Sequence, residues 1–250
     1  MKVLALIQAR MGSTRLPGKV MKKIMGKSMI EILLSRVSKA DLIDQIVIAT
    51  SKLPENQDMV EHLEGLGYLV YRGSEDDVLD RFYNAAVYFE ADYIIRITAD
   101  CPLVDPDLIN SVINYTIDKQ VDYGTNTLKE EFPDGQDIEV FTINSLRLAW
   151  QNAVLPSDRE HVTPYIRKNS DFYGRSIFKA INYFPITNYG HVRMTVDEID
   201  DFQAIDKLIT RFGTNESWQV YAEYIVNNIL EFNNQNIIRN EGYLKSLKKD

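Results

Sequence analysis

A cluster of cationic, glycine and hydroxyl residues follows the first apolar stretch of the chain. Residues 1–8 (MKVLALIQ) have the composition of a short buried strand and run directly into segment 9–19, ARMGSTRLPGK. This segment carries Arg10, Arg15 and Lys19, spaced by five and four residues. Glycines let a backbone approach a ligand closely, a helix N-terminus attracts anions, and arginine and lysine neutralise phosphate charge. The pattern predicts a polyphosphate site and a nucleotide-dependent enzyme.

The segment differs from two well-known phosphate-binding motifs. A P-loop requires G-x-x-x-x-G-K-[ST]. In this chain five residues separate Gly12 from Gly18, and Val20 stands where a hydroxyl residue would bind magnesium. The dinucleotide fingerprint G-x-G-x-x-G does not occur in the chain. On residue types alone, an ordinary basic loop between a strand and a helix stays open as an alternative.

Two aspartates follow predicted strands farther along the chain. Asp100 comes after the apolar stretch 93–98 (YIIRIT), and Pro102 then turns the chain out of the sheet. Asp197 follows a strand predicted over 191–195. Magnesium in nucleotide sites usually takes one or two carboxylates and phosphate oxygens, so the pair predicts a Mg²⁺ site. The alternative is that both aspartates cap local structure, Asp100 at a turn and Asp197 at the following helix.

A third polar segment, 71–81 (YRGSEDDVLDR), joins a predicted strand to a predicted helix. Arg72 ends the strand, Ser74 or Asp76 caps the helix, and Arg81 follows about one turn later. These side chains could close over a base and a ribose. The alternative is a capped helix with an ion pair between Asp77 and Arg81.

Strand-like and helix-like stretches alternate through the first half of the chain. The predicted strands are 2–8, 45–50, 68–71 and 93–98, and the predicted helices are 29–40 with Ser28 as N-cap, 55–66, 76–90 and 105–118 with Asp105 as N-cap. This order is typical of an α/β protein with a mostly parallel sheet. Ligands bind at the carboxyl ends of such strands, so the loops after Gln8, Thr50, Tyr71 and Thr98 are expected to share one edge.

The second half of the chain is less regular. We predict strands over 121–125, 137–141, 175–182 and 191–195, helices over 144–153, 161–168, 197–211 and 217–232, and a loop over 156–160. These elements complete a single domain over 1–232. Within this domain, residues 126–190 are a candidate for a small inserted region that contacts a second subunit or the acceptor. The polar tail 233–250 is predicted to be peripheral.

Composition limits the functional classes. The chain has 250 residues, of which 45% are hydrophobic and 26% charged, as in ordinary globular proteins. Its net charge of −8 disfavours a nucleic-acid surface. Its one cysteine, Cys101, excludes an internal disulfide and is read as a packing residue. No apolar run has the length of a membrane span and no signal peptide is recognised, so we expect a cytoplasmic protein without membrane or nucleic-acid partners.

The motifs, in this order, resemble the cytidylyltransferases that activate sialic acid and 3-deoxy-octulosonate, and among them the branch named for spore coat polysaccharide biosynthesis protein F. The resemblance covers roughly residues 1–210 and rests on segments 8–19 (QARMGSTRLPGK), 72–81 (RGSEDDVLDR), 96–106 (RITADCPLVDP), 135–141 (GQDIEVF), 159–166 (REHVTPYI) and 193–197 (RMTVD). Gln136 departs from the leucine expected in the fourth motif, which puts acceptor contacts alone in doubt.

The resemblance implies a three-layer α/β/α fold of the nucleotide-diphospho-sugar transferase (GT-A-like) type. It implies Mg²⁺-dependent transfer of CMP from CTP to an oxygen of a small acidic acceptor, with release of pyrophosphate, and a homodimer. Arg15, Lys19 and Asp100 would be catalytic, and Asp100 and Asp197 would hold Mg²⁺. Arg15 and Lys19 suit the leaving pyrophosphate because they neutralise the charge that develops on it.

The resemblance also implies two sets of binding residues. The nucleotide-binding set is Gln8, Ala9, Arg10, Gly12, Ser13, Thr14, Arg15, Lys19, Thr50, Arg72, Gly73, Arg81, Thr98 and Ala99, and the acceptor-binding set is Asp137, Glu139, Glu160 and His161. His161 suits a proton acceptor and equally a structural hydrogen-bonding residue. A glycosyltransferase of the same fold and a non-catalytic nucleotide-binding partner remain alternatives.

Overall fold

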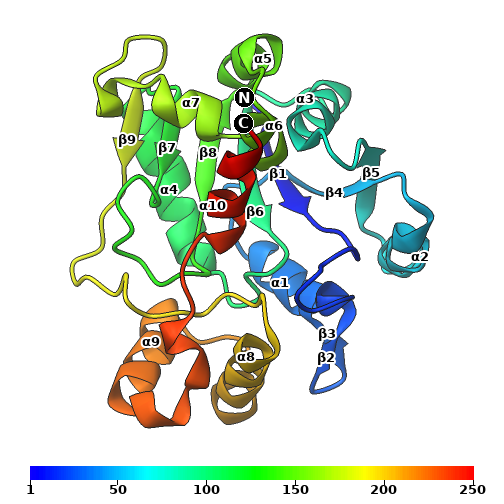
Figure 1. Ribbon diagram of the computed structural model, residues 1–250, viewed down its shortest axis with the longest axis vertical. Helices are drawn as coiled ribbons and strands as arrows, with labels where there is room; N and C mark the ends of the chain where they lie inside the picture. Colours follow the sequence, from blue (N-terminus) through cyan, green and yellow to red (C-terminus); the bar gives the residue numbers. More distant parts are fainter.

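The computed structural model describes residues 1–250 and has a central seven-stranded sheet between two layers of helices (Figure 1). The strand order is β5-β4-β1-β6-β8-β7-β9. The strands are β1 (Val3–Gln8), β4 (Gln45–Ser51), β5 (Leu69–Gly73), β6 (Tyr93–Thr98), β7 (Tyr123–Thr125), β8 (Glu139–Thr142) and β9 (Ala180–Asn182), and a separate hairpin pairs β2 (Lys23–Ile24) with β3 (Lys27–Ser28). Strands β5, β4, β1 and β6 are parallel, whereas β8 runs antiparallel to both β6 and β7.

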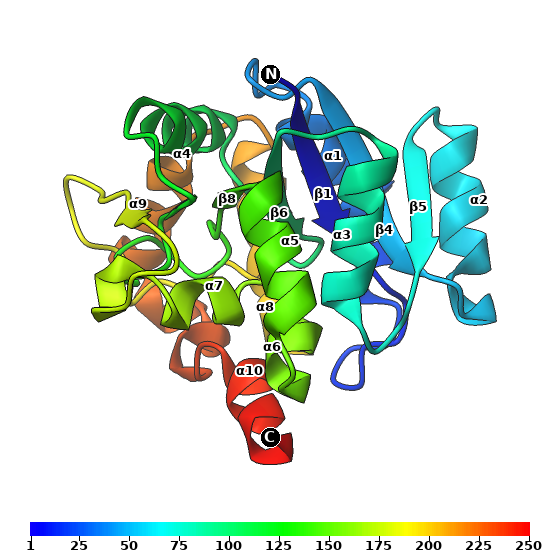
Figure 2. The same cartoon turned by 90° about the horizontal axis from the view of Figure 1, so that it is seen from above.

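The helices divide into two layers that bury separate apolar clusters (Figure 2). The first layer is α1 (Met29–Val37), α2 (Gln57–Gly65), α4 (Pro106–Asp118), α8 (Ile199–Phe212) and α9 (Trp218–Asn227); the second is α3 (Val78–Tyr88), α5 (Ile143–Asn152) and α7 (Pro164–Lys168). Beyond the sheet edge lie α6 (Pro156–His161) and α10 (Glu241–Ser246). None of the helices is long and apolar enough to cross a membrane. The predicted three-layer α/β fold is confirmed.

Short 3₁₀ turns connect several of these elements. They are η1 (Lys19–Met21), η2 (Pro54–Asn56), η3 (Asp171–Tyr173), η4 (Ile229–Glu231), η5 (Asn233–Asn236) and η6 (Leu247–Lys249). The turn η1 matters most, because it ends the basic loop that follows β1. Gly18, at φ +65°, precedes it in the left-handed conformation that glycine adopts without strain.

The helix caps explain several element boundaries. Ser28 forms the predicted cap of α1, and Glu31 returns a hydrogen bond to its backbone, completing a capping box. Asp105 forms the predicted cap of α4, accepting from Asp107 N at 2.9 Å. Helix α3 is capped by Asp77, which accepts from Asp80 N at 2.9 Å, one residue later than predicted.

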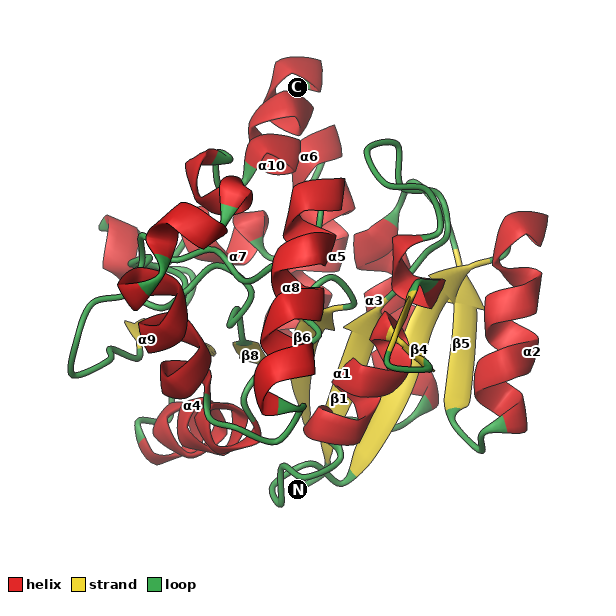
Figure 3. Ribbon diagram, turned by 90° about the horizontal axis from the view of Figure 1, so that it is seen from below, coloured by secondary structure: helices red, strands yellow, loops and turns green.

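The second half differs from its prediction at four places. The predicted loop 156–160 forms α6, because Pro156 occupies a first-turn position where its missing N–H costs nothing. The predicted strand 175–182 shortens to β9. Segment 191–195 joins only one bridge, between Asp134 and Arg193, so it forms no strand. The tail 233–250 is not peripheral, because α10 stands at the sheet edge toward which the parallel strands point (Figure 3).

Gly135 allows segment 134–137 to lie directly against segment 193–197. Its φ is +106°, and a Cβ atom there would lie 2.6 Å from both Met194 C and Thr195 N. The close approach is sealed by hydrogen bonds from Asp134 N to Val192 O at 2.9 Å and from Met194 N to Asp134 O at 2.6 Å. A side chain at position 135 would therefore separate the two segments.

We predict that Gly135→Ala is more destabilising than Gly174→Ala. Gly174 also has a positive φ, +73°, but nothing lies within 4 Å of its Cβ position. Alanine at 174 should cost about 1–2 kcal/mol for the left-handed backbone. Alanine at 135 should cost about 1–3 kcal/mol more because it also clashes with backbone. Urea unfolding of both variants measures this; equal losses would contradict the close approach.

Candidate active site

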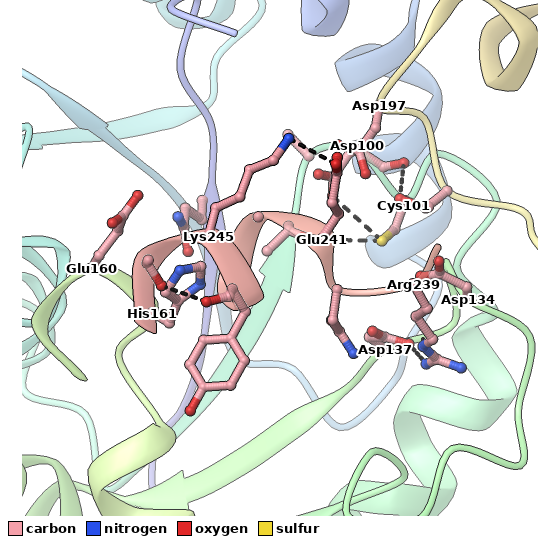
Figure 4. A pocket seen from close by; sticks show the side chains of 18 of the residues that line it. Asp100, Cys101, Asp134, Asp137, Glu160, His161, Asp197, Arg239, Glu241 and Lys245 are labelled. Atoms are coloured by element: carbon pink, nitrogen blue, oxygen red, sulfur yellow. Dashed lines mark hydrogen bonds and ion pairs between the residues drawn. The ribbon is translucent and has the colours of Figure 1, made fainter. Parts of the chain in front are cut away.

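A cavity of about 860 Å³ opens at the carboxyl edge of β1 and β6 (Figure 4). The basic loop after β1, the end of β6, the start of β8, α6, α7 and α10 all contribute to its wall. Most of the predicted site residues line it: Gln8, Arg10, Gly12, Ser13, Thr14, Arg15, Lys19, Thr98, Ala99, Asp100, Asp137, Glu139, Glu160, His161 and Asp197. The cavity thus unites residues that are far apart in the sequence.

Five predicted nucleotide-binding residues lie outside this wall: Ala9, Thr50, Arg72, Gly73 and Arg81. Ala9 and Thr50 are buried. Arg72 donates to Gln57 Oε1 at 2.6 Å and to Ser51 O at 3.3 Å. It therefore holds the connection between β4 and α2 and does not face the cavity.

Arg81 is turned into the protein interior. It is only 1% exposed and donates to Ser74 O at 2.5 Å. Burial lowers its pKa to about 10, although Glu75 partly opposes this shift. Gly73 makes room for it, because a Cβ there would lie 2.7 Å from Arg81 Cγ. The alternative ion pair with Asp77 does not form either, since Asp77 contacts Arg159 at 2.7 Å.

The Lys19 ammonium is the centre of the cavity's charge arrangement. Its Nζ lies 3.1 Å from Asp100 Oδ2, 2.9 Å from Asp197 Oδ1 and 2.7 Å from Val196 O. Burial alone would raise the pKa of Asp100, but the Lys19 charge lowers it to about 2. Burial would likewise lower the pKa of Lys19, and the two carboxylates together raise it. These pKa shifts keep both Lys19 and Asp100 charged at neutral pH.

The other two cations of the basic loop are also paired with carboxylates. Arg15 Nη2 lies 3.0 Å from Asp197 Oδ1, and Arg15 Nη1 lies 3.2 Å from Glu241 Oε2. Arg10 Nη1 donates to Glu75 Oε1 at 2.6 Å. An arriving phosphate would exchange places with these carboxylates on Arg10 and Arg15.

A buried arginine orients Asp197. Arg193 is 4% exposed and contacts Asp197 at 3.2 Å, Asp134 at 2.7 Å and Asp201 at 2.8 Å. Asp201 also accepts from Asp197 N at 2.9 Å, so Asp197 does not cap α8; Glu198 is the N-cap. Sequence reasoning missed Asp134 and Asp201. Asp201 is the last residue of the acidic run RMTVDEIDD (193–201), four residues after Asp197, and nothing in that run distinguishes it from its acidic neighbours.

Glu139 is a buried anion that fixes Arg96. It accepts from Tyr123 Oη at 2.6 Å and Thr163 Oγ1 at 2.5 Å, and pairs with Arg96. Burial alone would raise the pKa of Glu139, but the Arg96 charge and these donors outweigh burial and lower the pKa. Glu139 therefore stays ionised. Arg96 also donates to Gln8 Oε1 at 3.0 Å. The signal for Arg96 was a charge inside an otherwise apolar strand.

The far end of the cavity combines Asp137, Glu160 and His161 with residues of the tail. Asp137 Oδ1 accepts from Arg239 Nη2 at 2.7 Å, and this contact opposes the rise in its pKa that burial causes. His161 packs its ring edge against Tyr243, with centroids 5.1 Å apart, and its Nε2 is buried without a hydrogen-bond partner. Burial, with the Arg96 charge, lowers the His161 pKa to about 4. His161 is therefore neutral at pH 7.

The donor set at Asp100 and Asp197 suits a hard divalent cation. Both carboxylates already share one positive group, and both offer the oxygen ligands that Mg²⁺ prefers. No group of three or more histidine, cysteine, aspartate or glutamate side chains is arranged to hold a metal by itself. The remaining ligands would have to come from water and from a phosphate-bearing substrate, which is the usual arrangement for magnesium in nucleotide sites.

Fold and cavity together define a nucleotide-dependent α/β transferase, and comparison with known proteins makes this specific. The family model described as cytidylyltransferase matches residues 4–237. The chain therefore belongs to the cytidylyltransferase family, which confirms the predicted resemblance.

Three individual proteins illustrate the likeness. The "Uncharacterized protein MJ1063" of Methanocaldococcus jannaschii is 39% identical over 85% of each chain. The "Spore coat polysaccharide biosynthesis protein SpsF" of Bacillus subtilis is 37% identical over 84% of this chain and 88% of its own. A solved cytidylyltransferase from Leptospira borgpetersenii superposes with a TM-score of 0.88 at 31% identity, covering 96% of this chain and 100% of the other.

We predict that His161 makes the protein less stable as the pH falls from about 6.5 to about 4. The native state disfavours the His161 proton, because its pKa is lowered to about 4, whereas in the unfolded chain histidine binds a proton near its ordinary pKa of about 6.5. Protonation therefore favours unfolding throughout this window.

The measurement is urea unfolding between pH 8 and pH 4 for the wild type and His161→Gln. The variant should lose less stability across the window. His191→Gln, at an exposed position, is the control and should follow the wild-type curve. If His161→Gln lost as much unfolding free energy between pH 8 and pH 4 as the wild type, the buried, neutral state of His161 would be contradicted.

Proposed function

We propose that the protein transfers CMP from CTP to an oxygen of an acidic sugar or a related small molecule, in the synthesis of a surface polysaccharide or glycan. Family membership supports cytidylyl transfer, and the likeness to the spore coat polysaccharide protein supports the polysaccharide context. The observation that carries the proposal is the contact of Lys19 and Arg15 with Asp100 and Asp197 inside the cavity. It joins phosphate-binding cations to metal-binding carboxylates in one place.

The cations of the basic loop would bind the triphosphate of CTP. Attack at the α-phosphorus depends on positioning and charge neutralisation more than on covalent chemistry of the protein. Arg15 and Lys19 would stabilise the charge that develops on the leaving pyrophosphate. When they move to the phosphates, they leave the carboxylates of Asp100 and Asp197 without their present partner.

Asp100 and Asp197 would hold Mg²⁺. When bound, the metal supplies Lewis-acid stabilisation of phosphate charge and lowers the pKa of a hydroxyl that attacks. Arg193 would keep Asp197 turned toward Asp100, because its guanidinium is itself fixed by Asp134 and Asp201. Arg193 is therefore a positioning residue.

The nucleoside and the acceptor would occupy opposite sides of the Lys19 centre. Arg10, paired with Glu75, points to the side of the loop after β5, where we place the nucleoside. Asp137, Glu160 and His161 would face the acceptor.

Two alternatives keep a physical basis. A glycosyltransferase of this fold would bind a sugar nucleotide and release a nucleoside diphosphate, but three loop cations suit a triphosphate better than a diphosphate. A non-catalytic partner would bind CTP without releasing pyrophosphate. That the protein is a Mg²⁺-dependent homodimer, with contacts from 126–190, stays a prediction.

We predict that Asp100→Asn lowers turnover by about 10²- to 10³-fold, the size typical of losing one electrostatic contact to the transition state. The variant should stay folded but unfold at a lower temperature, because Lys19 loses one of its two carboxylate partners, so turnover is measured well below its thermal midpoint. Asp107→Asn, on the exposed first turn of α4, is the matched control and should leave turnover unchanged. Retained activity in Asp100→Asn would remove this carboxylate from the metal site.

We predict that CTP with Mg²⁺ raises the thermal midpoint more than ATP, GTP, UTP or a UDP-sugar does, because a ligand of the native state stabilises it. Incubation with CTP and a panel of carboxylated sugars should then release pyrophosphate. A shift with UDP-sugars and none with CTP would favour the glycosyltransferase. A CTP shift without pyrophosphate across the whole panel would favour the non-catalytic partner.

A further inference from the structure

The last part of the chain crosses the open side of the cavity. We call residues 239–250 the closing segment; it comprises Arg239, Asn240, helix α10 and the turn η6 up to Asp250. Several of its residues line the cavity wall, among them Arg239, Glu241 and Lys245 (Figure 4). The family model ends at residue 237, so this segment lies outside the part of the chain that defines the family.

The closing segment contacts one cation and one anion of the cavity that we assign to substrate binding, Arg15 and Asp137. Glu241 Oε2 lies 3.2 Å from Arg15 Nη1, the guanidinium assigned above to phosphate. Arg239 Nη2 lies 2.7 Å from Asp137 Oδ1, on the acceptor side. Glu241 therefore pairs with the proposed phosphate-binding cation Arg15, and Arg239 pairs with the proposed acceptor-side acid Asp137.

Hydrogen bonds attach both ends of the closing segment, and its middle adds the Glu241–Arg15 pair and the packing of Tyr243 against His161. Arg239 also donates to Phe132 O at 3.1 Å, and the Asp250 carboxylate accepts from Ser157 N at 2.9 Å and Ser157 Oγ at 2.6 Å. Within α10, only Ser246 is buried. A helix with so little buried apolar surface can open locally without unfolding the domain. Helix α10 can therefore open locally while Arg239 and Asp250 keep their hydrogen bonds.

We propose that the closing segment is a strap that occupies the phosphate side of the cavity in the ligand-free protein and that CTP displaces. The proposal rests on the proposed function, because it takes Arg15 to be a phosphate ligand. Arg15 also lies near Asp197 on its Nη2 side and 3.8 Å from Glu198 on its Nη1 side. Phosphate therefore competes with these carboxylates for the guanidinium, and Glu241 is the competitor that the closing segment supplies. Only protein with an open strap can bind CTP, so the apparent affinity is the intrinsic affinity multiplied by the open fraction. By linkage, bound CTP shifts the strap toward its open state.

The test is CTP binding to Glu241→Gln, measured by calorimetry without an acceptor. Glutamine keeps the length of the side chain and removes the charge that competes with phosphate. An exposed ion pair is worth a modest factor, so we expect CTP to bind about two- to fivefold more tightly than to the wild type. Glu231→Gln, whose glutamate pairs with Lys207 away from the cavity, is the matched control and should bind like the wild type. Unchanged or weaker binding to Glu241→Gln would overturn the strap.

Hydrogen exchange supplies a second measurement that does not depend on catalysis. Amides of 241–246 should exchange faster when CTP is bound, and faster in ligand-free Glu241→Gln than in the ligand-free wild type. Slower exchange with CTP would mean that the segment closes over the nucleotide, and it would overturn displacement.

The two proposals fail in different ways. If neither the wild type nor Glu241→Gln binds CTP, the proposed function fails, and the strap fails with it because there is no CTP to displace it. If the wild type binds CTP but Glu241→Gln behaves identically in both measurements, the strap fails and the proposed function stands.

Discussion

The structure depends most on the contact between one ammonium group and two carboxylates. Lys19 Nζ ties the loop after β1 to Asp100 at the end of β6 and to Asp197, 178 residues farther along the chain. Removing one member would leave buried charge without compensation, which is costly in a protein interior. Two further residues bring Asp197 to this contact. Gly135 lets segment 193–197 lie against segment 134–137, and Arg193 holds Asp197 in place. Stability and substrate binding therefore use the same charges.

This arrangement explains how a cavity so rich in charge is stable without a ligand. Each loop cation has a carboxylate partner within the protein, so few charges of the cavity are uncompensated. Under the proposed function, substrate binding would be an exchange of partners, in which phosphate and metal contacts replace the protein's own ion pairs. Such an exchange favours ligands that bring both signs of charge together, because neither the cations nor the carboxylates may be left unpaired when buried. A nucleoside triphosphate with its divalent cation has this composition.

The sequence predicted the first half of the fold and the centre of the site, but not the parts that long-range packing decides. Buried apolar strands and capping residues such as Ser28 and Asp105 are local signals, and they were read correctly. Arg72 and Arg81 stand in a plausible nucleotide motif, yet tertiary contacts turn both away from the cavity. The tail has no apolar periodicity, and the pairing of Arg239 with Asp137 across 102 residues leaves no trace in the local sequence.

The direction of one strand decides where the acceptor-side residues lie. Strand β8 is antiparallel to β6, and its register places Glu139 directly opposite Arg96. The start of β8, with Asp137 just before it, therefore lies toward the carboxyl end of β6, where Asp100 follows. A parallel strand with the same sequence would begin at the other edge of the sheet, where its acids could not reach the cavity. Arg96 contacts Gln8 on one side and Glu139 on the other, so this antiparallel strand joins the two sides of the cavity that we propose for the nucleotide and the acceptor.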